Sequence, residues 1–108
     1  MKNLNREIEF RAWDIEKKRM LQNVSSMLNN SSFILMQYIG KKDSSGKKIY
    51  EGEILKTNEG DWSASVIYRG THFVLALGNE GGFSTEPNWD KCTIRGNIYE
   101  NPGLMSWI

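Results

Sequence analysis

The chain has few of the residues on which metal sites and disulfides depend, with one cysteine and one histidine among its 108 residues. Cys92 cannot form an internal disulfide, and together with His72 it leaves only carboxylates to complete a zinc site. Because Cys92 begins a predicted strand, we expect it to be a small core residue. A zinc-centred or disulfide-stapled fold is therefore excluded.

Long hydrophobic runs are also absent. The longest, Phe33–Met36, ends at Gln37, far short of the roughly 20 residues that a membrane-spanning helix needs. The first residues contain no apolar stretch of the kind found in a secretory signal. We therefore expect a cytoplasmic protein with no membrane partner.

An excess of one charge is missing overall, since 14 Lys and Arg residues balance 13 Asp and Glu residues. Residues 1–48 nevertheless carry 10 basic and 5 acidic side chains, a balance of +5, whereas residues 49–108 carry 4 and 8, a balance of −4. This is neither a polybasic tail nor an acidic one. Opposite charges on one small domain are compatible with head-to-tail self-association.

The pattern of apolar residues predicts strands and almost no helix. Residues 7–13 alternate with period 2, Asp14–Lys18 favours a turn, and Arg19–Gln22 returns as the second strand of a hairpin over 7–22. Asn and Ser fill a connector over 23–32. Short apolar runs separated by glycine turns then predict five more strands, at residues 33–39, 49–56, 65–68, 72–77 and 92–99.

These strands predict a mainly all-β, barrel-like fold with at most short helical turns. Within the 49–56 strand, Gly52 indicates a bulge or a sharp bend. A chain of this length buries enough surface for one core, so we expect a single domain over 1–108, with its barrel-like part at 33–108.

Few residues are suited to catalysis. His72 is the only histidine and sits in a predicted strand, where a structural role is expected. Asp43, Glu51 and Glu53 could hold Mg²⁺ or Ca²⁺, but the spacing lacks the regularity of a calcium loop, and a solvated strand face is the favoured interpretation. We therefore expect no enzyme, no metal and no cofactor.

A basic and aromatic segment is the most suggestive feature for binding. Four lysines lie between Tyr38 and Tyr50, namely Lys41, Lys42, Lys47 and Lys48. Cations interleaved with rings are typical of proteins that bind single-stranded nucleic acid. A lysine-rich turn that serves solubility is the competing interpretation.

The C-terminal segment is apolar and includes Trp107 and Ile108. Such an end either packs on its own domain or docks on a neighbour. We expect these two residues to contact a second copy in a homo-oligomer.

Three segments together resemble the YopX family of small phage and prophage proteins: 6–14 (REIEFRAWD), 35–54 (LMQYIGKKDSSGKKIYEGEI) and 94–102 (IRGNIYENP). The family usually has Thr at position 39 and Asp at position 53, where this chain has Ile39 and Glu53. The resemblance implies a complex fold of coiled β-sheets that includes an SH3-like barrel, and a phage or prophage origin. It implies no activity.

The matching motifs supply further candidate residues: Trp13, Asp14, Tyr38, Asp43, Tyr50, Glu51, Asn97 and Tyr99. We expect a non-enzymatic phage accessory protein that binds a phage or host protein and self-associates. The alternative is a nucleic-acid-binding module that uses the segment from Tyr38 to Tyr50.

Overall fold

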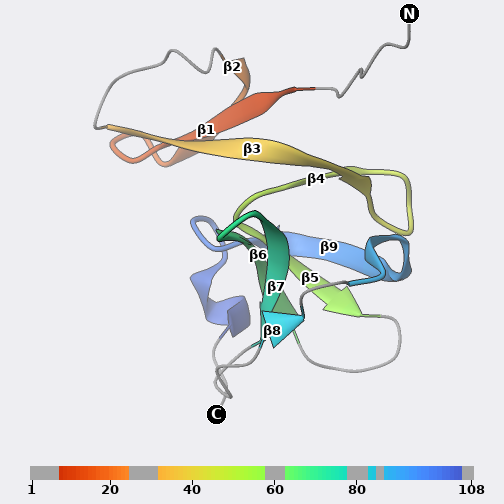
Figure 1. The fold of residues 1–108 in the computed structure, drawn as a ribbon. Helices are drawn as coiled ribbons and strands as arrows, with labels where there is room; N and C mark the ends of the chain where they lie inside the picture. The colour runs from red at the N-terminus through yellow and green to blue at the C-terminus, as the bar shows by residue number, and fades with distance from the viewer. Residues whose placement is uncertain (1–7, 25–31, 58–62, 78–82, 85–86, 106–108) are drawn as a thin grey trace, which may run out of the picture.

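Antiparallel strands build the protein, arranged in two sheets (Figure 1). The computed structural model describes residues 8–24, 32–57, 63–77, 83–84 and 87–105. Within these residues the only helices are two 3₁₀ turns, η1 (Trp89–Lys91) and η2 (Pro102–Met105). The predicted all-β fold with short helical turns is confirmed.

The first sheet has the strand order β2-β1-β3-β4. Its strands are β1 (Phe10–Asp14), β2 (Arg19–Val24), β3 (Phe33–Lys42) and β4 (Lys48–Tyr50). The predicted turn after β1 is confirmed, because Asp14 Oδ1 accepts hydrogen bonds from the backbone N–H groups of Glu16 and Lys17, both at 3.1 Å.

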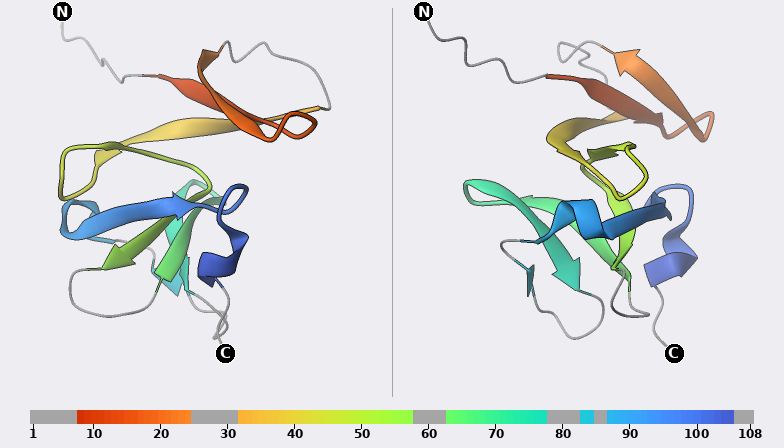
Figure 2. Two further views of the ribbon diagram at one scale, coloured as in Figure 1. Left: turned by 180° about the vertical axis from the view of Figure 1, so that it is seen from behind. Right: turned by 90° about the vertical axis from the view of Figure 1, so that its right-hand side faces the viewer.

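The second sheet has the order β8-β7-β6-β5-β9 and is strongly curved beneath the first (Figures 1 and 2). Its strands are β5 (Glu53–Thr57), β6 (Ser63–Arg69), β7 (His72–Leu77), β8 (Phe83–Ser84) and β9 (Cys92–Asn97). The predicted strand at 72–77 has the bounds of β7.

The strand predicted at 33–39 corresponds to β3, for which the sequence indicated no partner. In the structure β3 lies beside β1 in the first sheet, with Ala12 opposite Leu35 and Phe10 opposite Gln37. The chain passes to the second sheet later, at Gly52, between β4 and β5. Gly52 has φ +88°, and an added Cβ would lie 3.3 Å from both Met36 Sδ and the Tyr99 ring. The predicted bend is confirmed, and this position requires glycine.

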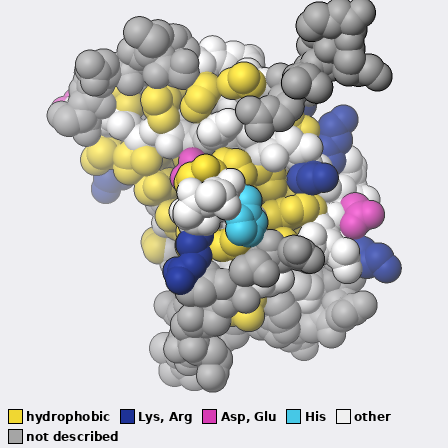
Figure 3. Space-filling view, viewed as in Figure 1, with side chains coloured by type: hydrophobic (Ala, Val, Ile, Leu, Met, Phe, Trp, Pro, Cys, Tyr) yellow, Lys and Arg dark blue, Asp and Glu magenta, His cyan; other side chains and the backbone are white. Residues whose placement is uncertain are grey.

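The hydrophobic core is centred on the second sheet and is joined by Ile49 of β4. Its central cluster contains six buried residues: Ile49, Leu55, Ala64, Val66, Leu75 and Cys92. The core role predicted for Cys92 is thereby confirmed. Partly buried side chains continue the core outward to the surface, where Figure 3 shows hydrophobic side chains around the single histidine.

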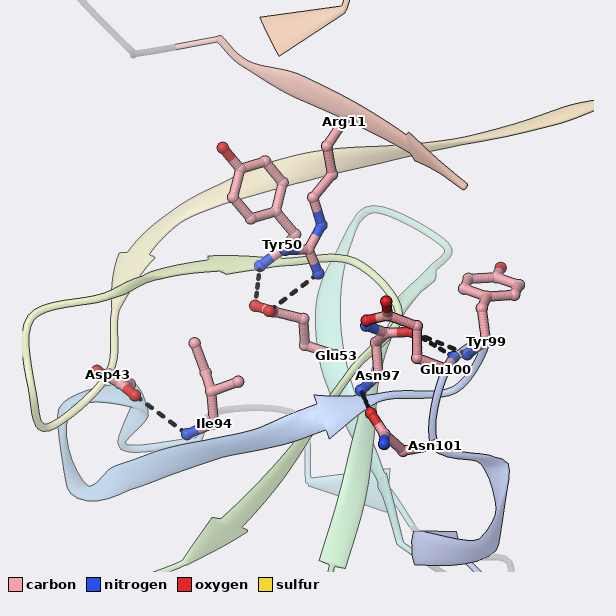
Figure 4. Close-up of polar contacts among 9 residues, drawn as sticks. All are labelled: Arg11, Asp43, Tyr50, Glu53, Ile94, Asn97, Tyr99, Glu100 and Asn101. Carbon is pink, nitrogen blue, oxygen red and sulfur yellow. Dashed lines mark hydrogen bonds and ion pairs between the residues drawn. The ribbon is translucent and has the colours of Figure 1, made fainter. Parts of the chain in front are cut away.

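A buried ion pair joins the two sheets (Figure 4). Arg11 of β1 lies 2.9 Å from the carboxylate of Glu53 in β5, and both side chains are buried. The Tyr50 backbone N–H also donates to Glu53, at 2.8 Å, and the Tyr50 ring lies 4.5 Å from the Arg11 guanidinium. The sequence-based prediction that Glu53 lies on a solvated strand face is therefore wrong. Burial raises the pKa of Glu53, and the charge of Arg11 opposes that rise.

A tight turn ends β9. Asn97 Oδ1 accepts hydrogen bonds from the N–H groups of Tyr99 and Glu100, at 3.0 and 2.8 Å, and this turn carries the chain away from the sheet earlier than predicted. Asn101 then folds back, and its Oδ1 accepts from the Asn97 N–H at 3.2 Å (Figure 4). A Cβ at Gly96 would lie 2.8 Å from the Asn101 side-chain carbon Cγ. A larger residue at Gly96 would have to displace the Asn101 side chain from its hydrogen bond with the Asn97 N–H.

Asp43 holds the loop between β3 and β4. One carboxylate oxygen accepts from the N–H groups of Ser45 and Lys47, both at 2.9 Å, and the other accepts from Ile94 of β9 at 3.0 Å. Burial raises the pKa of Asp43, but these backbone hydrogen bonds outweigh it and lower the pKa overall. The loop is thereby fixed against the start of β9.

We predict that Gly96→Ala destabilises the fold by about 1–3 kcal/mol, because the new methyl group collides with Asn101. Urea unfolding followed by tryptophan fluorescence measures the difference. Gly103→Ala is the matched control, since nothing lies within 4 Å of its added Cβ. Equal stability of the two variants would contradict this account of the turn.

We predict that Asp43→Asn costs about 2 kcal/mol at neutral pH, because the amide cannot replace both acceptor oxygens. The folded pKa of Asp43 lies below its unfolded value, so its stabilisation is present above the unfolded pKa, about 4, and is lost as the pH falls through the folded value. The difference in the free energy of unfolding between wild type and Asp43→Asn should therefore become smaller below about pH 4. Asp90→Asn, an exposed position, is the control, and a gap independent of pH would refute the prediction.

Candidate functional site

A groove lies where β3 meets the β6–β7 hairpin and η1. It consists of two adjoining hollows of about 710 and 600 Å³, which share Lys41, Pro87 and Trp89 as lining residues. Ile39 and Phe73 line the larger hollow, and both pack on the hydrophobic core. The groove therefore has a floor formed by core residues and is open to solvent.

Three aromatic side chains line the larger hollow. Tyr68 is 54% exposed, and its ring makes an edge contact with Phe73 of the neighbouring strand, with 5.0 Å between the ring centroids. Trp89 of η1 is half-buried against the core. These rings come from three separate elements, and none of them belongs to the predicted binding residues.

Cations line the same groove. Lys41 and Lys42, at the end of β3, are exposed, and within the described residues neither amine takes part in an ion pair or a side-chain hydrogen bond. Figure 3 shows basic side chains beside the hydrophobic ones on this face. Three acids oppose them: Asp90 is exposed and Asp43 is buried in the smaller hollow, and Glu51 is half-buried in the larger one.

The Asp43 hydrogen bonds determine where the two lysines lie. They hold the β3–β4 loop to β9, directly after η1. The adjacent Ser44 N–H also donates to the carbonyl of Cys92, at 2.8 Å. Lys41, Lys42 and Trp89 are therefore kept at one groove although about 50 residues separate them in the sequence.

The predicted segment from Tyr38 to Tyr50 is split by the fold. Tyr38 and Tyr50 are both buried and pack on each other, with 5.7 Å between ring centroids. The Lys48 amine lies 5.3 Å from the Tyr38 ring and forms an ion pair with Glu9. These two tyrosines are not available to stack on a ligand, whereas Lys41, Lys42 and Lys47 remain exposed.

The Tyr50 hydroxyl is part of the same buried cluster. It donates a hydrogen bond to Glu9 Oε1 at 2.9 Å. Burial and this nearby carboxylate raise the pKa of Tyr50 to about 12. The hydroxyl therefore stays protonated at neutral pH and serves as a structural donor.

The remaining motif residues lie mostly in structural positions. Trp13 stacks on Tyr99 with 6.1 Å between ring centroids, which connects β1 to the turn after β9. Asp14 and Asn97 are buried and organise turns. Glu51 lines the groove, and its carboxylate accepts a long 3.5 Å hydrogen bond from the Gln37 N–H.

Metal ligation finds little support among the three carboxylates singled out in the sequence. The oxygens of Asp43 and Glu53 already bind backbone N–H groups, and Glu53 also pairs with Arg11. Among the residues that the structure describes, no group of three His, Cys, Asp or Glu side chains is placed to hold a metal.

His72 lines the larger hollow and is exposed on the β6–β7 turn. Its Nδ1 lies 3.2 Å from the Thr71 hydroxyl, and no described carboxylate bonds to its ring.

In the same described part of the chain, no helix is long and apolar enough to cross a membrane.

Self-association through Trp107 and Ile108 stays a prediction, since both residues lie outside the described part of the chain.

The aromatic residues of the groove carry no distinguishing signal in the sequence. Tyr68 and Phe73 lie on predicted strands where alternation assigns a side chain to a face and says nothing of what lies across from it. Only the tertiary fold brings them to Trp89.

Two solved structures share this fold. Protein EF1440 from Enterococcus faecalis superposes with a TM-score of 0.79 at 21% identity, covering 94% of this chain and 100% of its own. The protein yopX from Bacillus subtilis gives a TM-score of 0.55 at 18% identity, covering 91% and 98%. At these identities the likeness concerns the fold alone. Comparison with curated proteins gives no match.

The family model described as YopX protein matches residues 23–106, which include the second and third of the segments that carry the resemblance. Because that match spans well over half of the sequence, the chain belongs to the YopX family.

Proposed function

We propose that this protein is a non-enzymatic phage or prophage accessory protein that acts by binding nucleic acid in the groove beside Trp89. The observation that carries the proposal is the pair of exposed lysines, Lys41 and Lys42, which have no acidic partner among the described residues and line a groove with aromatic walls. Unpaired cations beside rings suit a polyanion that carries planar bases.

The lysines supply the electrostatic part of such binding. Each ammonium group that contacts a phosphate releases condensed counterions, so affinity falls as salt rises. Lys47 is a third exposed cation, on the β3–β4 loop, but it lines neither hollow. Asp43, Glu51 and Asp90 oppose them, which limits the charge-driven part to a few phosphate contacts.

Binding without catalysis agrees with the state of the titratable groups. Asp43 and Glu53 are engaged by backbone N–H groups and are unsuited to exchange protons with a ligand. His72 faces the groove, but no described carboxylate orients its ring as in a catalytic pair. Phage or prophage origin rests on family membership and on no feature of the groove.

We predict that the double substitution Lys41→Ala/Lys42→Ala weakens binding to a labelled single-stranded DNA and flattens its salt dependence. Two lost phosphate contacts should reduce the slope of log K against log salt by about 1.4. Fluorescence anisotropy between about 50 and 200 mM salt measures both effects.

Lys17→Ala is the control. Lys17 is exposed on the β1–β2 turn, and within the described part of the chain only its backbone N–H takes part in a hydrogen bond, which alanine keeps. Its slope should equal that of wild type. No binding by wild type at low salt, or the same slope change with Lys17→Ala, would reject the proposal.

A further inference from the structure

The lysines of the groove do not explain its aromatic walls. Tyr68 is one of the few large apolar side chains in the described residues that remain exposed, at 54%. A ring that only filled space would gain more by burial, since each aromatic side chain can bury ~150–250 Å². Its place beside Phe73, on a hollow that Trp89 also lines, indicates a surface for a planar ligand.

Bases in a duplex are already stacked on each other and present only their edges in the grooves. Unpaired bases expose their faces and stack on aromatic side chains. The hollow of about 710 Å³ is lined by the rings of Tyr68, Phe73 and Trp89 and also by Lys41 and Glu51. That arrangement places faces for bases next to charge for the backbone.

We infer that the groove selects unpaired bases, which stack on Tyr68 and Trp89 while the sugar–phosphate backbone runs past Lys41 and Lys42. This inference rests on the nucleic-acid binding proposed above and specifies its ligand as a single strand. Stacking accepts any base, because every base has a π-face, so the preference for single strands should not depend on one sequence.

Tyr68→Ala tests the stacking step. Tyr68 is exposed, and its ring contact is with Phe73, so its removal leaves the core residues in place. Tyr68→Phe is the matched control, because it keeps the ring and removes only the hydroxyl. Thermal unfolding measurements check whether both variants are as stable as wild type.

Three probes of equal length and label separate stacking from charge: an oligothymidine of about 12 nucleotides, its abasic counterpart, and a duplex of the same length. Anisotropy titrations with wild type should show that the oligothymidine binds more tightly than both other probes. Tyr68→Ala should weaken oligothymidine binding about 5- to 150-fold, the range for one lost stacking contact, and leave abasic binding unchanged. Tyr68→Phe should match wild type.

The ways in which the inference can fail are distinguishable. If wild type binds the abasic probe or the duplex as tightly as the oligothymidine, the stacking inference is overturned while nucleic-acid binding stands. The stacking inference is overturned in the same way if Tyr68→Ala weakens all three probes equally. If none of the probes binds at low salt, both the inference and the proposed function fall, and a protein partner takes their place.

Discussion

The ion pair between Arg11 and Glu53 is the contact on which the arrangement of the two sheets depends. Burying two charges costs several kcal/mol per ion, which is offset only when the charges meet each other and their remaining polar atoms find partners. Here Arg11 comes from β1 and Glu53 from β5. Glu53 also accepts from the Tyr50 backbone N–H, and the Tyr50 ring lies against the guanidinium, whereas Arg11 Nε is buried with no hydrogen-bond partner among the described residues. Neither sheet can shift against the other without separating a buried charge from its partner. The groove, which lies between β3 of one sheet and the β6–β7 hairpin of the other, takes its shape from that fixed arrangement.

The family motifs consequently describe how the protein folds more than what it binds. Four motif residues have structural roles. The Tyr50 backbone supports the ion pair between the sheets, and Asp43 holds the β3–β4 loop. Gly52 forms the bend between β4 and β5, and Asn97 forms the turn after β9. The groove aromatics come from the 57–91 region, which contains none of the quoted motifs. Lys41, Lys42 and Glu51 are exceptions, because they lie in the 35–54 motif and also line the groove. A resemblance based on these motifs therefore transfers the scaffold reliably and leaves the ligand open.

Local patterns in the sequence predicted those parts of the fold that local chemistry determines. A short apolar run located β7, an interior glycine located the bend at Gly52, and Asp14 located the first turn. The pairing of strands could not be predicted, because no local pattern in the sequence specifies that β3 lies beside β1. The prediction for Glu53 was wrong because period 2 separates two faces but does not reveal that a second sheet covers the polar one. The groove required three elements to converge, which no linear pattern records.

The small number of cations constrains what the groove can do. Two lysines amount to about two phosphate contacts, and by counterion release alone such a site binds weakly at physiological salt. Asp43 and Asp90 line the smaller hollow together with both lysines, and their negative charges oppose phosphate there. Each stacked base adds about 1–3 kcal/mol, independent of salt to first order. If the groove binds nucleic acid, stacking must therefore supply most of the affinity, and a ligand without accessible base faces loses the main source of its binding free energy.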